Sequence, residues 1–388
     1  MNSGRDGGYS MAGFLRISAV LLIILSGCLT GGQKPPQTEA GLHYPILSHA
    51  DWWQSQYGLS RKAWTDAFGA NYRNENSGPA CAVMVIKYKK RARISADLNS
   101  FSDPEYPRVR TDVRWKFCRA NTGKGYPGGF ADDDGAEVSG SEMVDVLEHE
   151  DIPVVVHSGK REAALDRIAE AIGRTSLVIC RVDPSLYFSD EKPGDRRWVV
   201  VYGIDRLIVS VNDPGRPEGK TKRIARGDFL AALQKAGGET DPILLECVVM
   251  VGNYSDGWHA DGRSRMFVDY YKGVRSEIGF PFDNGGSSSV HTVGLCVVQD
   301  YLKPAAAPSA AKAELSLLVL NQAMIRVFWI HGAIFEKYFS VWGFEKLGSP
   351  ISDEYPVPGG RRQDFEKGNL TWNGKEATVK IDTIGKKN

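Results

Sequence analysis

The chain carries almost no net charge, and after its N-terminal segment the sequence has no long apolar run. Its 388 residues hold 48 Lys and Arg against 47 Asp and Glu, a formal net charge of +1 at neutral pH. A balance so close to zero does not indicate a nucleic-acid partner or a strongly acidic surface. Beyond the N-terminal segment, no apolar stretch approaches the roughly 20 residues that a membrane-spanning helix requires. The length permits two or three domains.

Cysteine is scarce, with six in the chain. Without Cys28, which is discussed next, the remaining five are odd in number, so at least one is free or pairs between chains. No spacing among them is typical of a zinc site, and we predict neither a metal nor a cofactor. Cys180 and Cys247 lie in apolar, strand-like runs and are expected to be small buried hydrophobes.

A short apolar run at residues 17–25 follows Arg16 and ends in Ser26, Gly27 and Cys28. The run is too short to span a membrane and has the layout of a secretory signal. Residues 25–28 resemble the lipobox of bacterial lipoproteins, which implies cleavage before Cys28 and several acyl chains on it. Several chains anchor a protein stably. The alternative is an accidental apolar tail that happens to contain a cysteine.

Local sequence patterns predict the main helices and strands that follow the N-terminal segment. Apolar residues at helical spacing predict helices over 80–88, 162–172 and 228–236. Runs of β-branched residues predict strands over 152–156, 177–182, 198–204 and 207–211. Residues 31–45 and 303–312 have the composition of a tether and a linker. Residues 92–140, rich in Asp, Gly, Pro and Arg, are interpreted as a long loop insertion.

Two motifs stand in order along the first two thirds of the chain. The run SGPACAVMVIKY at 77–88 opens an apolar helix, and GDRRWVVVYG at 194–203 is followed by the turn VNDP at 211–214. Together they resemble papain-like cysteine peptidases, most closely the bacteriocin-leader (double-glycine) type. The resemblance covers most of residues 61–250 and implies an α+β, papain-like fold.

The departures from that family pattern concern the catalytic residues. The resemblance places Ser77 at the nucleophile position, Arg197 at the base, Asn71 at the oxyanion-hole position, and Asp213 as the residue that orients the base. A serine needs a nearby base, whereas arginine has five donors and no acceptor and is not deprotonated in proteins. Thiol or serine catalysis at these positions is therefore not expected. We expect Arg197 to turn toward Asp213 and meet its carboxylate with two bonds, and Ser77 to cap the helix.

Other residues were weighed as substitutes for the missing groups. Cys81 lies one helical turn beyond Ser77, on the same helix face, but in an apolar stretch that favours core packing. His149 and His157 flank the strand predicted over 152–156 and are interpreted as solvated loop histidines. An active cysteine-type peptidase or amidase acting on envelope peptides, with an unrecognised nucleophile, is the alternative left open.

The last third of the chain repeats itself. A helix-like aromatic run leads to IGFP at 278–281 and then to QDY at 299–301; a second such run leads to LGSP at 347–350 and then to QDF at 363–365. This pattern resembles the LGFP repeat of bacterial envelope proteins, a family linked to cell-wall association. Gly279 and Gly348, each close before a proline, indicate tight turns.

The second repeat supplies candidates for contact with a wall polymer. Three aromatic residues offer faces on which a sugar can stack, although such aromatics more often lie in a core. Three polar residues would contact hydroxyl groups or only cap turns. The candidates are Tyr338, Trp342, Asp353, Gln363, Asp364 and Trp372.

These observations predict the organisation of the whole chain. We expect a signal peptide at 1–27, a tether at 28–60, a peptidase-like domain at 61–255, LGFP-like modules at 256–302 and 321–388, and a linker at 303–320. The function expected is binding: cell-wall polymer on the repeats and peptide in the former cleft, without catalysis. Leu29 is not the aspartate that holds many lipoproteins at the inner membrane, which favours an outer-membrane anchor facing the periplasm. A purely architectural spacer is a further alternative.

Lipidation of Cys28 is directly testable. Metabolic labelling with palmitate should mark the wild-type chain, because the lipobox-like residues 25–28 direct acylation to this cysteine. The variant Cys28→Ala should remain unlabelled. Label that persists in the variant would contradict the lipoprotein interpretation.

Overall fold

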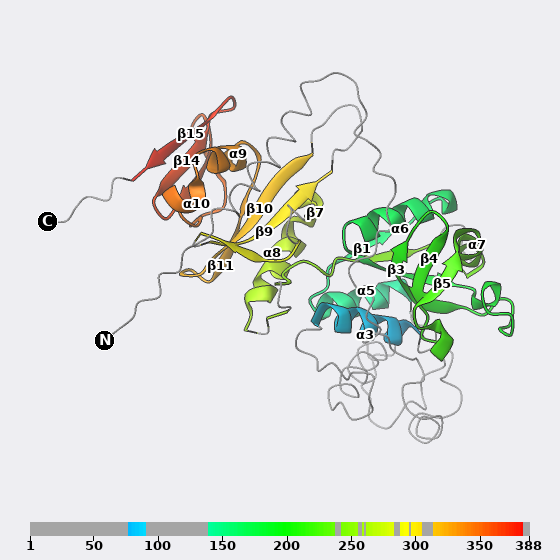
Figure 1. Ribbon diagram of the computed structural model, residues 1–388. Helices are drawn as coiled ribbons and strands as arrows, with labels where there is room; N and C mark the ends of the chain where they lie inside the picture. The colour runs from blue at the N-terminus through cyan, green and yellow to red at the C-terminus, as the bar shows by residue number, and fades with distance from the viewer. Residues whose placement is uncertain are drawn as a thin grey trace, which may run out of the picture.

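The computed structural model describes residues 77–90, 139–236, 242–254, 258–259, 261–282, 288–294, 296–304 and 313–382. The predictions for Cys28, Asn71, the tether and nearly all of 92–140 lie outside the described residues. Figure 1 shows a sheet flanked by helices in the first half of the chain and smaller sheets with their helices in the second half.

The first body is built on a six-stranded sheet in the order β1-β6-β2-β3-β4-β5. Each adjacent pair of strands is antiparallel. Every residue of β3 is buried, as expected for a Val-rich strand at the centre of a covered sheet. The strands are β1 (Val154–His157), β2 (Leu177–Val182), β3 (Arg197–Ile204), β4 (Ile208–Asn212), β5 (Lys222–Ala225) and β6 (Leu244–Cys247).

Helices cover both faces of this sheet (Figure 1). α3 (Ser77–Lys90) and α5 (Gly140–His149) lie on one face, and α6 (Ala164–Gly173) and α7 (Arg226–Ala236) on the other. Side chains of β3 alternate between the two cores: Trp198 and Val200 face α3, whereas Val199 and Val201 face α6 and α7. α3 is apolar around its circumference, and its described side chains are buried accordingly.

The second half contains two further sheets with short helices. α8 (Arg263–Ile278) precedes a five-stranded sheet in the order β11-β10-β9-β7, in which β8 also pairs with β9. α9 (Gly332–Ser340) and α10 (Gly343–Lys346) precede a four-stranded antiparallel sheet, β12-β13-β14-β15. The strands are β7 (Phe280–Pro281), β8 (His291–Val293), β9 (Cys296–Lys303), β10 (Glu314–Asn321), β11 (Arg326–Ile330), β12 (Tyr355–Val357), β13 (Gly360–Phe365), β14 (Gly368–Trp372) and β15 (Ala377–Ile381).

Strand β10 is buried on both faces and joins the two repeats. Leu318 and Leu320 pack in the core that contains α8, whereas Leu317 and Val319 pack in the core that contains α9. The prediction of a linker over 303–320 is therefore wrong for its described residues beyond 312. The apolar run after residue 314 pairs with β9 along its length, because each face of this strand finds a separate helix to cover it.

The first repeat also shares a core with the peptidase-like body. Val248 and Val251, which follow β6, pack with Phe267 and Tyr271 of α8. The buried Lys89 of α3 donates to the carbonyl of Val251 at 3.0 Å. The predicted boundary at 255/256 therefore does not separate independent domains, because cutting there would divide one apolar core.

The predicted fold class, α+β, is confirmed, and the structure adds that the strands of each described sheet pair antiparallel. The helices predicted at 80–88, 162–172 and 228–236 and the strands predicted at 177–182, 198–204 and 207–211 are all present, with ends within a few residues of those expected. α5 was not predicted, although Ser139 and Glu142 form a capping box at its start. In the part of the chain that the structure describes, no helix is long and apolar enough to cross a membrane.

Candidate functional site

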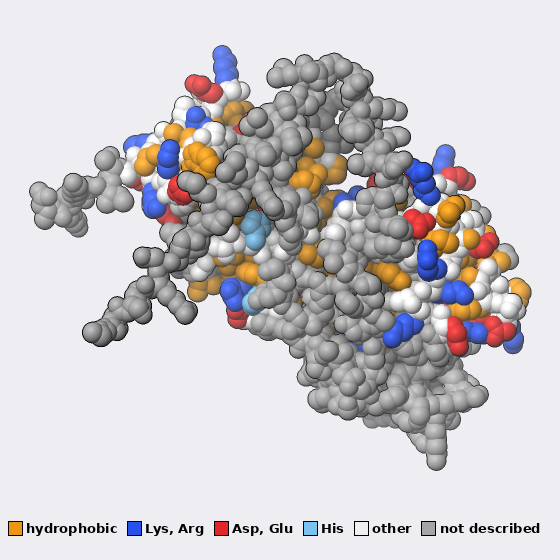
Figure 2. Space-filling view, viewed as in Figure 1, with side chains coloured by type: hydrophobic (Ala, Val, Ile, Leu, Met, Phe, Trp, Pro, Cys, Tyr) orange, Lys and Arg blue, Asp and Glu red, His pale blue; other side chains and the backbone are white. Residues whose placement is uncertain are grey.

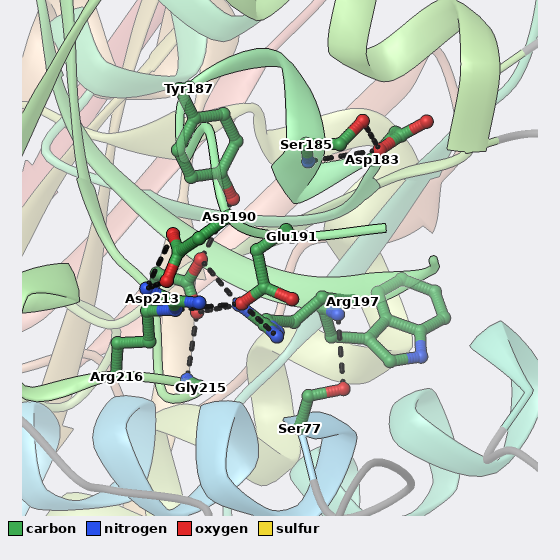
Figure 3. Close-up of polar contacts among 11 residues, drawn as sticks. Ser77, Asp183, Ser185, Tyr187, Asp190, Glu191, Arg197, Asp213, Gly215 and Arg216 are labelled. Carbon is green, nitrogen blue, oxygen red and sulfur yellow. Dashed lines mark hydrogen bonds and ion pairs between the residues drawn. The ribbon is translucent and has the colours of Figure 1, made fainter. Parts of the chain in front are cut away.

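The start of α3 lies against the start of β3. The hydroxyl of Ser77 accepts a hydrogen bond from the backbone N–H of Trp198 at 3.1 Å, and both residues are buried. Trp198 directly follows Arg197, so the two positions that the motifs assign to nucleophile and base meet at one place, as Figure 3 shows.

Arg197 begins β3, Asp213 directly follows the neighbouring strand β4, and the two residues are in contact, as predicted. Nη1 of Arg197 is 3.4 Å from each carboxylate oxygen of Asp213. The predicted form of the contact is wrong, because one guanidinium nitrogen serves both oxygens instead of two nitrogens in a fork. The second terminal nitrogen of Arg197 is engaged by another residue.

That other residue is Glu191, which the sequence did not single out. Nη2 of Arg197 donates to Oε1 of Glu191 at 2.9 Å, and Nε of Arg216 donates to the same oxygen at 2.8 Å. Arg216 also pairs with the exposed Asp190 at 2.7 Å. Figure 3 shows Glu191 between the two guanidinium groups. The acidic pair Asp190 and Glu191, which precedes β3, could have indicated an ion pair in this region. The local sequence does not indicate which cation the pair contacts.

Asp213 is fully buried, and its two oxygens have further partners. The Tyr187 hydroxyl donates to Oδ2 at 2.8 Å, and the backbone N–H of Gly215 donates to Oδ1 at 2.8 Å. Burial, followed by the charge of Asp213, raises the pKa of Tyr187 well above its ordinary value. Gly215 leaves room for the guanidinium of Arg197, because a Cβ at this position would clash with it unless the arginine side chain shifted.

The cluster contains charged groups, but Arg197, at the position that the motifs assign to the base, cannot act as one. Burial lowers the pKa of Arg197, yet the carboxylates of Asp213 and Glu191 outweigh it and leave the pKa above its ordinary value. The guanidinium therefore stays protonated and cannot accept the proton of the Ser77 hydroxyl. Both carboxylates that touch Arg197 are engaged by cations and other donors. The geometry suits a structural ion cluster.

The substitutes considered from the sequence do not supply the missing groups. Cys81 is fully buried, and burial raises the pKa of its thiol well above the ordinary value, so the reactive thiolate is disfavoured. His149 ends α5. The interpretation of His157 as a solvated loop residue is wrong, since it ends β1 and lies 2.7 Å from the buried carboxylate of Glu246. Arg174 binds the same carboxylate at 2.8 Å.

The two repeats share a detailed set of contacts around the predicted turns. Tyr271 donates to the carbonyl of Gly279 at 3.0 Å, and Tyr338 donates to that of Gly348 at 2.9 Å. Both glycines have positive φ, +85° and +74°, as predicted for tight turns. Tyr271 stacks on Tyr301, and Tyr338 stacks on Phe365 in the same way. The first repeat, weaker in sequence, is therefore built like the second.

A buried glutamine occupies the same place in both repeats, two residues before the stacked ring. Nε2 of Gln299 donates to two backbone carbonyls, and so does Nε2 of Gln363. Oε1 of Gln299 accepts bonds from the N–H of Gly252 and the hydroxyl of Tyr301. Oε1 of Gln363 has no partner, because Phe365 lacks that hydroxyl and no described donor takes the place of Gly252.

Most of the predicted wall-binding residues make internal contacts. Tyr338 and Gln363 are fully buried, so the prediction that they contact a ligand is wrong. Asp353 accepts a hydrogen bond from Tyr270 at 2.6 Å, and Asp364 accepts one from Tyr355 at 2.7 Å.

Two of the predicted aromatics remain. Trp372 packs, partly buried, against the core around α9. Trp342 differs from the rest, because its side chain is 48% exposed.

Charged groups on the rest of the described surface do not form a metal site. Within the described ranges, no group of three or more His, Cys, Asp or Glu residues is arranged to hold a metal ion. Figure 2 shows basic and acidic side chains interspersed on the face in view, in keeping with the near-zero net charge.

Replacement of Arg197 tests the ion cluster. Arg197→Met leaves the buried Asp213 without its cation and should lower the free energy of unfolding by about 3–5 kcal/mol. Arg216→Met is the matched control, because Arg216 is more exposed and should cost only about 0–1 kcal/mol. Urea denaturation of both variants beside the wild type measures the difference. Equal losses in the two variants would contradict the central role of Arg197.

The difference in stability between the wild type and Arg197→Met should also depend on pH. Burial raises the pKa of Glu191, but hydrogen bonds and charge from Arg197 and Arg216 outweigh it and hold the pKa below its ordinary value of 4.5. A carboxyl with a lowered pKa stabilises the fold above pH 4.5, and this contribution is lost as the pH falls through its folded value. The difference in stability between wild type and Arg197→Met should therefore shrink in acid.

Comparison with known proteins identifies one part of the chain. Residues 347–383 match the model of the LGFP repeat, within the predicted second module. A structure assigned as a C39-like peptidase from Bacillus anthracis aligns with 45% of this chain and 88% of that chain, at 12% identity and a TM-score of 0.30. A TM-score this low carries no argument about kinship. No curated protein matches the chain. The LGFP repeat indicates an association with the cell envelope.

Proposed function

We propose that this chain is a lipid-anchored envelope protein that binds cell-wall polymer through its second repeat, and that its peptidase-like domain is not catalytic. The observation that carries the proposal is the LGFP repeat at residues 347–383. Cys28 would hold the chain to a membrane, by the lipobox-like residues around it. Leu29 favours the outer membrane as the place of the anchor.

The loss of catalysis is supported by the surroundings of Arg197. A base must accept a proton, and the residue at the base position is a buried cation held by two carboxylates. The alternative is a hydrolase with Cys81 as nucleophile. It is disfavoured because the side chain of Cys81, a residue of α3, is fully buried in the core. A peptide ligand for the peptidase-like domain stays a prediction.

The architecture supports a bridging role between two parts of the envelope. The sheet of β9, β10 and β11 lies between the core around α8 and the core around α9. The first repeat in turn shares its core with the residues that follow β6. A wall polymer held by the second repeat would therefore orient the peptidase-like body, while the segment before residue 77 would connect it to the membrane.

Absence of peptidase activity is the first test. The purified chain should leave peptide and casein substrates intact, because no group at the base position accepts the proton of Ser77. Ser77→Ala gives the background rate, and turnover above it would contradict the proposal. A thiol-directed electrophile applied to the folded protein gives a second readout. Labelling that disappears in Cys81→Ala would favour the hydrolase alternative.

Binding to wall material is the second test. The full-length chain in detergent should sediment with purified peptidoglycan sacculi, because the second repeat is an LGFP module. The full chain is needed, since a fragment of 256–388 would lose Val248 and Val251 from the core around α8. An unrelated lipoprotein of similar size is the control. A chain that stays in the supernatant with that control would contradict wall binding.

A further inference from the structure

Trp342 stands at a sharp corner of the second repeat. Helix α9 ends at Ser340 and α10 begins at Gly343, so the chain turns at Val341 and Trp342. Trp342 has φ +58° and ψ +51°, the left-handed conformation, which is unfavourable for a residue with a Cβ. A glycine would relieve this strain, yet the position holds the largest side chain of all, 48% exposed.

The corner itself is held by backbone hydrogen bonds. The N–H of Trp342 donates to the carbonyl of Phe339, and the carbonyl of Trp342 accepts from the N–H groups of Glu345 and Lys346. Gly343 follows because a Cβ there would lie 2.3 Å from the ring of Tyr338. The left-handed conformation is thus imposed by the surrounding backbone. The exposed indole does not create it.

The first repeat lacks this corner. From Tyr271 to Gly279, α8 continues without a break up to Ile278. The equivalent interval in the second repeat, from Tyr338 to Gly348, contains two more residues, since 348 − 338 is 10 and 279 − 271 is 8. The added turn carries Trp342 outward. The repeat whose core continues into the peptidase-like body has no such corner, whereas the repeat at the C-terminal end has one.

We propose that Trp342 is the residue with which the second repeat contacts wall polysaccharide, by stacking its indole on the apolar C–H face of a pyranose ring. The inference rests on the proposed wall binding and names its contact residue. An aromatic face attracts the slightly positive C–H groups of a sugar ring, as it does other positive edges. The exposed Glu345 and Lys346 of α10, three and four residues after Trp342, offer an acceptor and a donor for hydroxyl groups of such a ring.

The other aromatic candidates do not compete for this role. Tyr338 is stacked on Phe365 inside the core, and Trp372 is partly buried against the core around α9. Backbone strain at an exposed residue costs stability, and at Trp342 it coincides with an aromatic face on which a sugar ring can stack. This reasoning separates Trp342 from a surface tryptophan in an ordinary helix.

The test uses a substitution that should improve the fold and damage binding. Trp342→Gly removes the indole and suits the left-handed backbone, so the midpoint of urea unfolding should stay equal or rise. Its half-saturating concentration on purified sacculi should rise about tenfold or more. Trp342→Phe should retain part of the binding.

Ile325→Gly is the matched control. Ile325 also has a positive φ, +51°, and is 67% exposed, but it lies in the turn between β10 and β11 and not in the corner between α9 and α10. Both residues precede the matched range 347–383. This variant relieves the same kind of strain and removes a similar exposed apolar side chain, so its binding to sacculi should equal that of the wild type.

The outcomes distinguish the inference from the proposed function. If the wild type does not bind sacculi, the proposed function and the inference both fail. If the wild type binds and Trp342→Gly binds equally well, wall binding stands and the role of Trp342 is wrong. If Trp342→Gly loses binding together with unfolding stability, the residue is structural and the inference is overturned. Loss of binding at unchanged or raised stability supports it.

Discussion

The double burial of strand β10 holds the described part of this chain together. One face of the strand covers α8 and the other covers α9, so two apolar cores are separated by a single layer of backbone. This strand contributes side chains to both cores, so separating it from either repeat would expose apolar surface to water. The core around α8 extends further, to Val248 and Val251 after β6. Mechanical continuity from the peptidase-like body to the second repeat follows from this shared packing.

The ion cluster around Arg197 is organised around a fully buried carboxylate, that of Asp213. Without a cation beside it, this carboxylate would carry a considerable desolvation cost. Arg197 neutralises the charge of Asp213, and Glu191, which also binds Arg197, is neutralised in turn by Arg216. Gly215 makes room for the guanidinium group. The result is a cluster in which the charged groups hold one another in place.

The two repeats have diverged around a common frame. Tyrosine, glycine, glutamine and a stacked ring occupy matching places in both. The first repeat satisfies both oxygen lone pairs of its glutamine with Gly252 and Tyr301, and so binds itself to the preceding domain. The second leaves the corresponding oxygen of Gln363 without a partner and adds a corner that presents Trp342. The first repeat thereby makes contacts within the chain, and the second repeat exposes Trp342 to solvent.

Local sequence determined the elements whose signal is local. The Val-rich runs of β2 and β3, the apolar helix α3 and the glycine turns at Gly279 and Gly348 depend on neighbouring residues, and these were predicted. The pairing of Arg197 with Asp213 was also predictable, because the ordered motifs set both positions. Glu191 and Tyr187 were not, since ion-pair and hydrogen-bond partners from a loop depend on how the chain returns in space.

Tertiary structure alone decided which apolar residues are covered. The run after residue 314 looked like the continuation of a linker, and became a central strand because a helix packs on each of its faces. Tyr338 and Trp342 are both aromatic residues four positions apart, yet one is fully buried and the other is about half exposed. Their sequence does not distinguish them, because burial depends on the partner that reaches each side of the chain, and that partner comes from distant residues.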